Sequence, residues 1–86
     1  MASYKIEISA TAEKQLGKLS RADQIRVLRS ILTLGLNPRP RGCRKLKGYD
    51  DIYRIRVGIF RVIYSIEEKK VLVIILKIGQ RKDIYR

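Results

Sequence analysis

With 86 residues, the chain has room for one domain with a thin core, which we expect to span residues 1–86. The absence of histidine and the presence of only one cysteine, Cys43, exclude an internal disulfide and a histidine-based ribonuclease mechanism, and they argue against a zinc site. The formal net charge of +12 favours a polyanionic partner, either nucleic acid or an acidic protein segment.

Apolar residues are spread along the whole chain and make up 45% of it, which predicts a folded globule rather than a disordered basic tail. No stretch approaches the roughly 20 apolar residues of a membrane span, and the opening MASYKIEIS lacks a long apolar signal core. A small chain without a disulfide is typical of the cytosol. We therefore expect a cytoplasmic protein that makes no contact with a membrane.

The first 20 residues predict a strand followed by a helix. Residues 3–8 alternate polar and apolar side chains, as in a short strand with one buried face. Ser9 or Thr11 is expected to cap the helix, which ends between residues 17 and 20. Its expected core-facing side chains are Ala12, Leu16 and Leu19.

A second helix is predicted to begin at the SRAD segment, where Ser20 stands three residues before Asp23 as in a capping box. Gly35 and the Asn37–Pro38 pair are expected to end it. The side chains expected to face the core are Ile25, Leu28, Ile31 and Leu32.

The second half of the chain predicts strands. Residues 39–48 are basic and contain Pro40 and Gly42, which is typical of an exposed connection leading into a short strand near residues 45–47. Gly58–Ile59 predicts a two-residue hairpin turn, and a polar turn is expected at residues 67–70. The three longer strands are expected at residues 52–57, 60–66 and 71–77.

This order of elements predicts an α+β fold with an N-terminal strand, a two-helix hairpin and then an antiparallel sheet of about four strands. The helices are expected to cover one face of the sheet and to leave the other open.

The positive charge is concentrated in two segments. Residues 39–61 carry a net charge of +6 and residues 77–86 a net charge of +3, so two short segments supply three quarters of the excess. An evenly solvated surface would spread this charge along the chain. The distribution favours one concentrated binding surface.

The expected hairpin places arginines opposite one another. If Gly58–Ile59 is the loop, Arg56 pairs with Arg61 and Arg54 lies on the same, open face. Opposed like charges cost roughly 0.2–1 kcal/mol, a cost that an anion bridging the pair would offset. Arginine forks suit phosphate and could stabilise a pentacoordinate transition state. Alternatively, these arginines only keep the edge of a sheet soluble.

Cofactor chemistry finds little support in the sequence. The acidic pairs Asp50–Asp51 and Glu67–Glu68 both fall in predicted turns, and phosphate-loop and dinucleotide fingerprints are absent. We therefore expect no cofactor, and phosphate chemistry that depends on cations and on a phenol. Tyr85 suits base stacking as well as packing.

Two segments, KLKGYDDIYRIRVGIFRVIYSI and the ending IGQRKDIYR, resemble the RelE branch of the RelE/ParE toxins. The resemblance extends over nearly the whole chain and implies a RelE-like fold. It also implies the toxin of a type II toxin–antitoxin system, which cuts messenger RNA in the ribosomal A site without metal. In that reaction a ribose 2′-oxygen attacks the adjacent phosphorus.

The resemblance also implies site residues. Arg54 and Arg56 match the basic pair of the central strand. Arg61 would stabilise the transition-state phosphate, Arg81 would lie near the leaving 5′-oxygen, and Tyr85 would position or deprotonate the nucleophile. The implied contacts to messenger or ribosomal RNA are Arg44, Lys45, Lys47 and Lys82.

Two departures from the family pattern affect the mechanism. Arg56 stands where a lysine would be a more credible base, because a guanidinium hardly releases its proton. Gln80 stands where some relatives carry histidine or lysine. Both departures favour catalysis by positioning and electrostatics, with the ribosome orienting the substrate.

The resemblance implies a RelB-like antitoxin whose acidic side chains cover the basic site, in a toxin–antitoxin hetero-oligomer. Two other functions remain open: a ParE-like inhibitor of DNA gyrase, and a ribosome or RNA binder without catalysis. The arginine and tyrosine set favours the nuclease.

Overall fold

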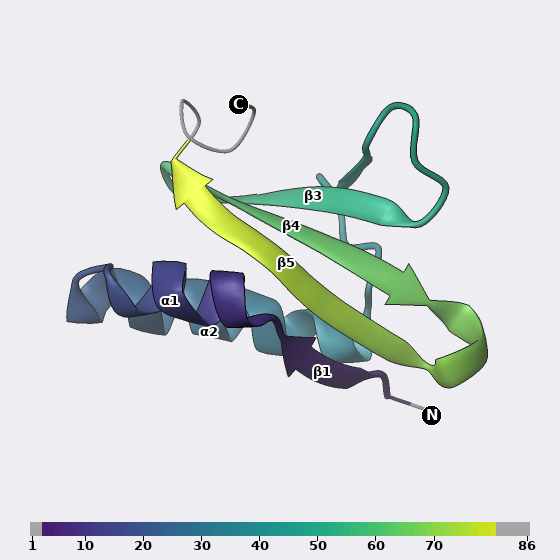
Figure 1. The fold of residues 1–86 in the computed structure, drawn as a ribbon, viewed down its shortest axis with the longest axis horizontal. Coiled ribbons are helices and arrows are strands. Elements are labelled where there is room, and N and C mark those ends of the chain that lie inside the picture. The colour runs from purple at the N-terminus through teal and green to yellow at the C-terminus, as the bar shows by residue number, and fades with distance from the viewer. Residues whose placement is uncertain (1–2, 81–86) are drawn as a thin grey trace.

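The computed structural model describes residues 3–80, in which two helices pack on one face of a five-stranded sheet (Figure 1). The elements are β1 (Lys5–Ile8), α1 (Ala10–Gly17), α2 (Arg21–Leu36), β2 (Arg44–Lys45), β3 (Ile52–Val57), β4 (Phe60–Glu67) and β5 (Leu72–Gln80). A short 3₁₀ turn at Glu68–Lys70 joins β4 to β5. The predicted α+β fold, with both helices on the same face, is confirmed. Neither helix is long and apolar enough to cross a membrane.

The strand order is β1-β5-β4-β3-β2. The hairpins β3–β4 and β4–β5 are antiparallel, as predicted, whereas β1 pairs with β5 in parallel and makes the sheet mixed. At the opposite edge, β2 is very short and pairs with only Tyr53 and Arg54 of β3. The two edges therefore differ, because β1 extends along β5 for four residues while β2 leaves most of β3 uncovered.

Both helix starts are capped by serine, as the sequence predicts. The Ser9 hydroxyl accepts the N–H of Ala12 at 3.1 Å, and the Ser20 hydroxyl accepts that of Asp23 at 3.2 Å. Each bond satisfies one of the N–H groups that a helix leaves without an intrahelical acceptor at its start. Ser9, rather than Thr11, is the cap of α1.

The core-facing side of α2 differs in part from the prediction, which is confirmed for Ile31 and wrong for Ile25 and Leu32. Val27, Ile31 and Leu34 are fully buried against the sheet, whereas Ile25 and Leu32 are 46% and 64% exposed. Consecutive residues of a helix point about 100° apart, so the stripe that contains Ile31 turns its neighbour Leu32 to solvent. The stripe that packs on the sheet is set by residues 27, 31 and 34, of which the sequence predicted only Ile31.

The Asn37–Pro38 pair ends α2, as predicted, whereas Gly35 does not. It lies inside the helix, where its carbonyl accepts the N–H of Tyr4 at 2.7 Å, and Asn37 is the cap that follows. A Cβ atom at Gly35 would stand 3.1 Å from the Tyr4 carbonyl oxygen. The absence of a side chain at Gly35 therefore favours the close approach of α2 to the chain entering β1.

Several strand boundaries also shift by one to three residues, including the end of β5, which runs to Gln80 rather than to residue 77. The strand expected at residues 45–47 occupies Arg44–Lys45, and β5 begins at Leu72 because Val71 adopts a left-handed conformation with φ of 51°. The two-residue hairpin loop is confirmed, with φ of 61° at Gly58.

A β-bulge resets the faces of β5. Ile63 pairs with Lys77 and Tyr64 with Ile75, so Leu76 is the extra residue. The Leu76 carbonyl accepts a hydrogen bond from the Ser9 hydroxyl at 3.1 Å, which ties the bulge to the start of α1. Beyond the bulge Ile78 returns to the core, while Lys77 lies on the face without helices.

Candidate nucleic-acid interface

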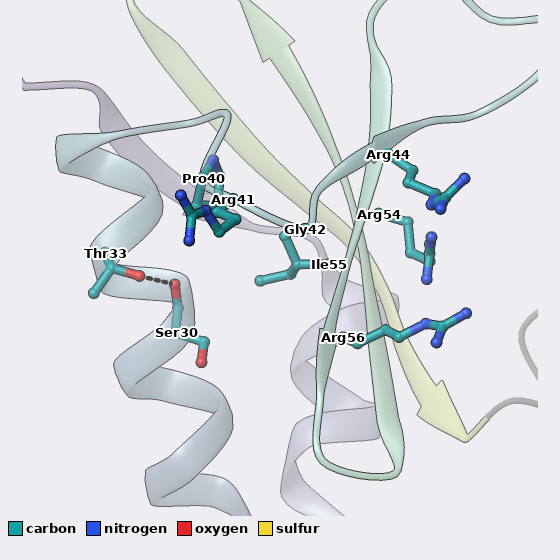
Figure 2. Close-up of a pocket in the computed structure, with 9 residues that line it drawn as sticks. All are labelled: Ser30, Thr33, Pro40, Arg41, Gly42, Arg44, Arg54, Ile55 and Arg56. Carbon is teal, nitrogen blue, oxygen red and sulfur yellow. Dashed lines mark hydrogen bonds between the residues drawn. The ribbon is translucent and has the colours of Figure 1, made fainter.

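The predicted register of the β3–β4 hairpin is confirmed: Arg56 lies opposite Arg61, and Val57 opposite Phe60. On the next strand, Arg44 lies opposite Arg54. Because cross-strand partners share a face, all four arginines stand on the side of the sheet away from the helices. Figure 2 shows three of them projecting to the same side of β3. We call Arg44, Arg54, Arg56 and Arg61 the arginine face.

Burial within the arginine face is uneven. Arg44 and Arg56 are exposed, as expected for an open face, whereas Arg54 and Arg61 retain only 5% and 7% of their accessible surface. Long arginine side chains lying along a sheet can be covered through their stems by neighbouring side chains. A guanidinium shielded from water interacts more strongly with an anion than an exposed one does. An anion that reaches Arg54 or Arg61 would therefore be held in a less hydrated environment than one at the exposed pair.

Strand β5 completes the surroundings of Arg61. Gly79 lies opposite Arg61, and Lys77 lies opposite Ile63 on the same face. Gly79 has no side chain to compete for the space beside Arg61, and the exposed Lys77 adds a further cation. Sequence reasoning did not select Lys77, because the bulge that turns it to this face has no clear signal in the sequence.

Two of the other predicted RNA contacts, Lys45 and Lys47, lie apart from the arginine face. Lys45 is opposite Tyr53, whose side chain packs against the core, so Lys45 belongs to the helix-covered side of the sheet. Lys47 is exposed in the turn after β2. Three predicted site residues lie outside the described residues: Arg81, Lys82 and Tyr85.

A pocket of about 460 Å³ borders the arginine face (Figure 2). None of its described lining residues is acidic. They are Ser30, Thr33, Pro40, Arg41, Gly42, Arg44, Arg54, Ile55 and Arg56. Sequence reasoning missed Arg41, which was counted only as part of the basic segment 39–61.

Arg39 serves a different purpose from the arginine face. Its guanidinium lies 2.6 Å from Glu68, donates to the Tyr53 hydroxyl at 3.2 Å and covers the Tyr53 ring. The Tyr4 hydroxyl donates to Glu68 at 2.6 Å. This bond, reinforced by Arg39, lowers the pKa of Glu68, and the same bond raises the pKa of Tyr4. The positive charge of Arg39 therefore links Tyr53 of β3 to Glu68 of the 3₁₀ turn.

Metal chemistry has no obvious site in residues 3–80, where no group of three or more His, Cys, Asp or Glu side chains could hold an ion. Cys43 is partly buried and packs against the core.

Comparisons with known proteins agree with the fold. Residues 6–85 match the family model described as ParE toxin of the type II toxin–antitoxin system parDE. The "Putative toxin RelE1" of Methanocaldococcus jannaschii is 34% identical over 96% of each chain.

Solved structures with the same fold include toxins crystallised with antitoxins. The archaeal RelE–RelB complex from Pyrococcus horikoshii matches with a TM-score of 0.83 and 35% identity, over 94% of this chain and 98% of the other. The RelBE2 toxin–antitoxin complex of Mycobacterium tuberculosis matches with a TM-score of 0.82 and 24% identity, over 93% of this chain and all of the other. The chain therefore belongs to the RelE/ParE toxin superfamily and is a RelE-type toxin of the type II toxin–antitoxin class.

Proposed function

We propose that the protein is a metal-independent endoribonuclease that cuts messenger RNA in the ribosomal A site. The observation that carries the proposal is the arginine face: four guanidinium groups from three strands gather on one side of the sheet, and two of them are buried. Opposed arginines are unfavourable in a sheet, so their cost is best explained by a phosphate that bridges them.

In the proposed reaction the ribose 2′-oxygen forms a bond to the adjacent phosphorus and the bond from phosphorus to the 5′-oxygen breaks. A proton moves from the 2′-hydroxyl to the leaving 5′-oxygen, which gives a 2′,3′-cyclic phosphate and a 5′-hydroxyl. Arg61, Arg54 and Arg56 stabilise the negative charge that builds up on the phosphate oxygens. Because a guanidinium is a poor base, orientation of the substrate by the ribosome supplies much of the rate.

Further roles follow from the family resemblance. Arg81 lies near the leaving 5′-oxygen, and Tyr85 positions or deprotonates the 2′-hydroxyl. The RNA and ribosome contacts proposed are Arg44, Lys45, Lys47 and Lys82. Lys45 faces the helix-covered side of the sheet and Lys47 lies in the turn after β2, so both stand apart from the arginine face. Their separation supports a role in contacting ribosomal RNA rather than the scissile phosphate.

We also propose that a cognate RelB-like antitoxin binds the toxin in a hetero-oligomer and covers the arginine face with acidic side chains. The relatives from P. horikoshii and M. tuberculosis were solved as toxin–antitoxin complexes, which supports this partner. The protein acts in the cytoplasm, where ribosomes and messenger RNA are, as one domain spanning residues 1–86.

Inhibition of DNA gyrase is the second candidate, because the matching family model is described as a ParE toxin. The arginine face favours the nuclease, since ParE-like relatives generally lack the full arginine and tyrosine set.

Primer extension on messenger RNA incubated with the purified protein, with and without translating ribosomes, tests the proposal. We expect cuts within codons that require ribosomes and disappear in Arg61→Ala. The control is Arg21→Ala, which removes an exposed charge at the start of α2 and should cut normally. Because Arg61 is buried, circular dichroism should show that its variant is folded. No cuts with the folded wild-type protein would shift the assignment to gyrase inhibition or plain RNA binding.

A further inference from the structure

The pocket beside the arginine face extends around the uncovered edge of β3 to helix α2. Arg44, Arg54 and Arg56 project to one side of β3, while Arg41 lies on the other side, toward Ser30 and Thr33 of α2 (Figure 2). The path is open because β2 pairs with β3 only at Tyr53 and Arg54. One continuous pocket therefore joins two groups of cations that the strand separates.

Arg41 is held on a well-defined turn. The Cys43 N–H donates to the Pro40 carbonyl at 3.0 Å, and Gly42 has φ of 90°. A glycine with positive φ at the third position, inside an i to i+3 hydrogen bond, is typical of a type II turn, and Arg41 stands at the second position of this turn. The backbone that carries this exposed guanidinium is therefore fixed before any ligand arrives.

The α2 side of the pocket contributes hydroxyl groups. The Thr33 hydroxyl donates to the Ser30 carbonyl at 2.7 Å, which occupies its proton. Ser30 is half-buried and lines the same pocket, and its hydroxyl is the candidate neutral donor on this side. A guanidinium fork beside a hydroxyl donor suits the oxygens of a phosphate group.

The chemistry of the pocket points to a polyanion. Its described lining carries four arginines and no carboxylate, and the strand stands between Arg41 and the other three. Charges spaced along one chain can satisfy both groups of cations. Pro40 and the buried Ile55 are the only wholly apolar side chains among the described lining residues, which is few for the apolar core that a protein partner buries at an interface.

We propose that Arg41, assisted by Ser30, binds a second phosphate of the RNA substrate, so that the strand crosses the edge of β3 from the arginine face toward α2. This inference rests on the proposed nuclease function and deepens it. Arg41 is a substrate-binding residue that sets the path of the RNA beyond the scissile phosphate.

The test is the affinity for a short single-stranded RNA that carries 2′-O-methyl groups and cannot be cut, measured at several salt concentrations. Each lost phosphate contact lowers the slope of log affinity against log salt by about 0.7 for single strands. We expect Arg41→Ala to lose about that much slope and to bind roughly tenfold more weakly at low salt. Arg41→Lys should keep the slope, because it keeps the charge.

Two matched variants sharpen the result. Ser30→Ala should weaken binding a few-fold without changing the slope, because a neutral donor displaces no counterion. Arg21→Ala removes an equally exposed arginine of the same chain and should bind like the wild type.

The second phosphate site and the nuclease function on which it rests can fail separately in these experiments. If the wild-type protein cuts on the ribosome but Arg41→Ala keeps the wild-type slope, the second phosphate site is refuted while the nuclease stands. The site is also refuted if Arg41→Ala weakens binding of an acidic protein partner and leaves RNA binding unchanged. Failure of wild-type cleavage on the ribosome refutes the nuclease itself.

Discussion

The two faces of the β3–β4 hairpin are built from alternating residues of the same strands and have opposite character. On the helix-covered face, Ile55, Val57 and Val62 are buried in an aliphatic core. On the other face, Arg54, Arg56 and Arg61 stand side by side in the confirmed register. The two faces therefore have separate roles. The helix-covered face stabilises the fold by burying apolar side chains, and the other face concentrates positive charge at some cost in stability.

The helix-covered face should carry most of the stability. We predict that Ile31→Ala lowers the free energy of unfolding by about 2–5 kcal/mol, because it opens a cavity where the side chain is fully buried. The control is Leu32→Ala, at the neighbouring, largely exposed position, which should cost less than about 0.5 kcal/mol. Urea denaturation of both variants measures the difference. Equal losses would mean that α2 packs on the sheet through a different stripe.

Tyr64 is the polar exception on the helix-covered face. It is fully buried, and its hydroxyl donates to the Pro38 carbonyl at 2.7 Å. Tyr64→Phe leaves that buried carbonyl without this donor and should cost about 1–3 kcal/mol, read from urea denaturation at neutral pH.

The pH dependence of this loss has a definite sign. Burial raises the pKa of Tyr64 above its ordinary value, so above about pH 10 the unfolded chain releases the phenolic proton before the folded one does. The contribution of Tyr64 is therefore complete below pH 10 and falls as the pH rises further. The difference in free energy of unfolding between wild type and Tyr64→Phe should become smaller above pH 10. A difference that grows with pH would contradict a buried, neutral phenol.

On the arginine face, removing a side chain should raise the free energy of unfolding rather than lower it. We predict that Arg44→Thr raises the free energy of unfolding by about 0.2–1 kcal/mol, because it removes the like charge opposite Arg54. Lys45→Thr is the matched control: it makes a similar change one residue along the same strand, opposite Tyr53. The gain of Arg44→Thr over Lys45→Thr should shrink in high salt, where repulsion is screened. A loss of stability for Arg44→Thr alone would show that the pair is not repulsive.

The hairpin and its charges could be predicted from the sequence because a two-residue loop fixes the register. Once Gly58–Ile59 is identified as the loop, the pairing of Arg56 with Arg61 follows by counting. The serine caps could also be predicted, because a capping serine is recognised from the few residues that follow it in the sequence.

Features that depend on tertiary contacts could not be read in the same way. Ile25 and Leu32 are as apolar as Ile31, and only the way α2 sits on the sheet decides which stripe is buried. Gly35 looked like a helix stop because its role, a close approach to Tyr4, lies 31 positions away in the chain. The role of Arg41 likewise depends on a pocket between α2 and an uncovered strand edge.

The central claim is that the arginine face holds a phosphate while the neighbouring 2′-oxygen attacks it. The most direct measurement is cleavage on translating ribosomes of a messenger RNA with a single 2′-deoxy nucleotide on the 5′ side of the mapped cut. We expect cleavage to stop at that position, while the unmodified RNA yields a 2′,3′-cyclic phosphate end and Arg61→Ala leaves both RNAs intact. Continued cutting at the deoxy position would contradict the mechanism.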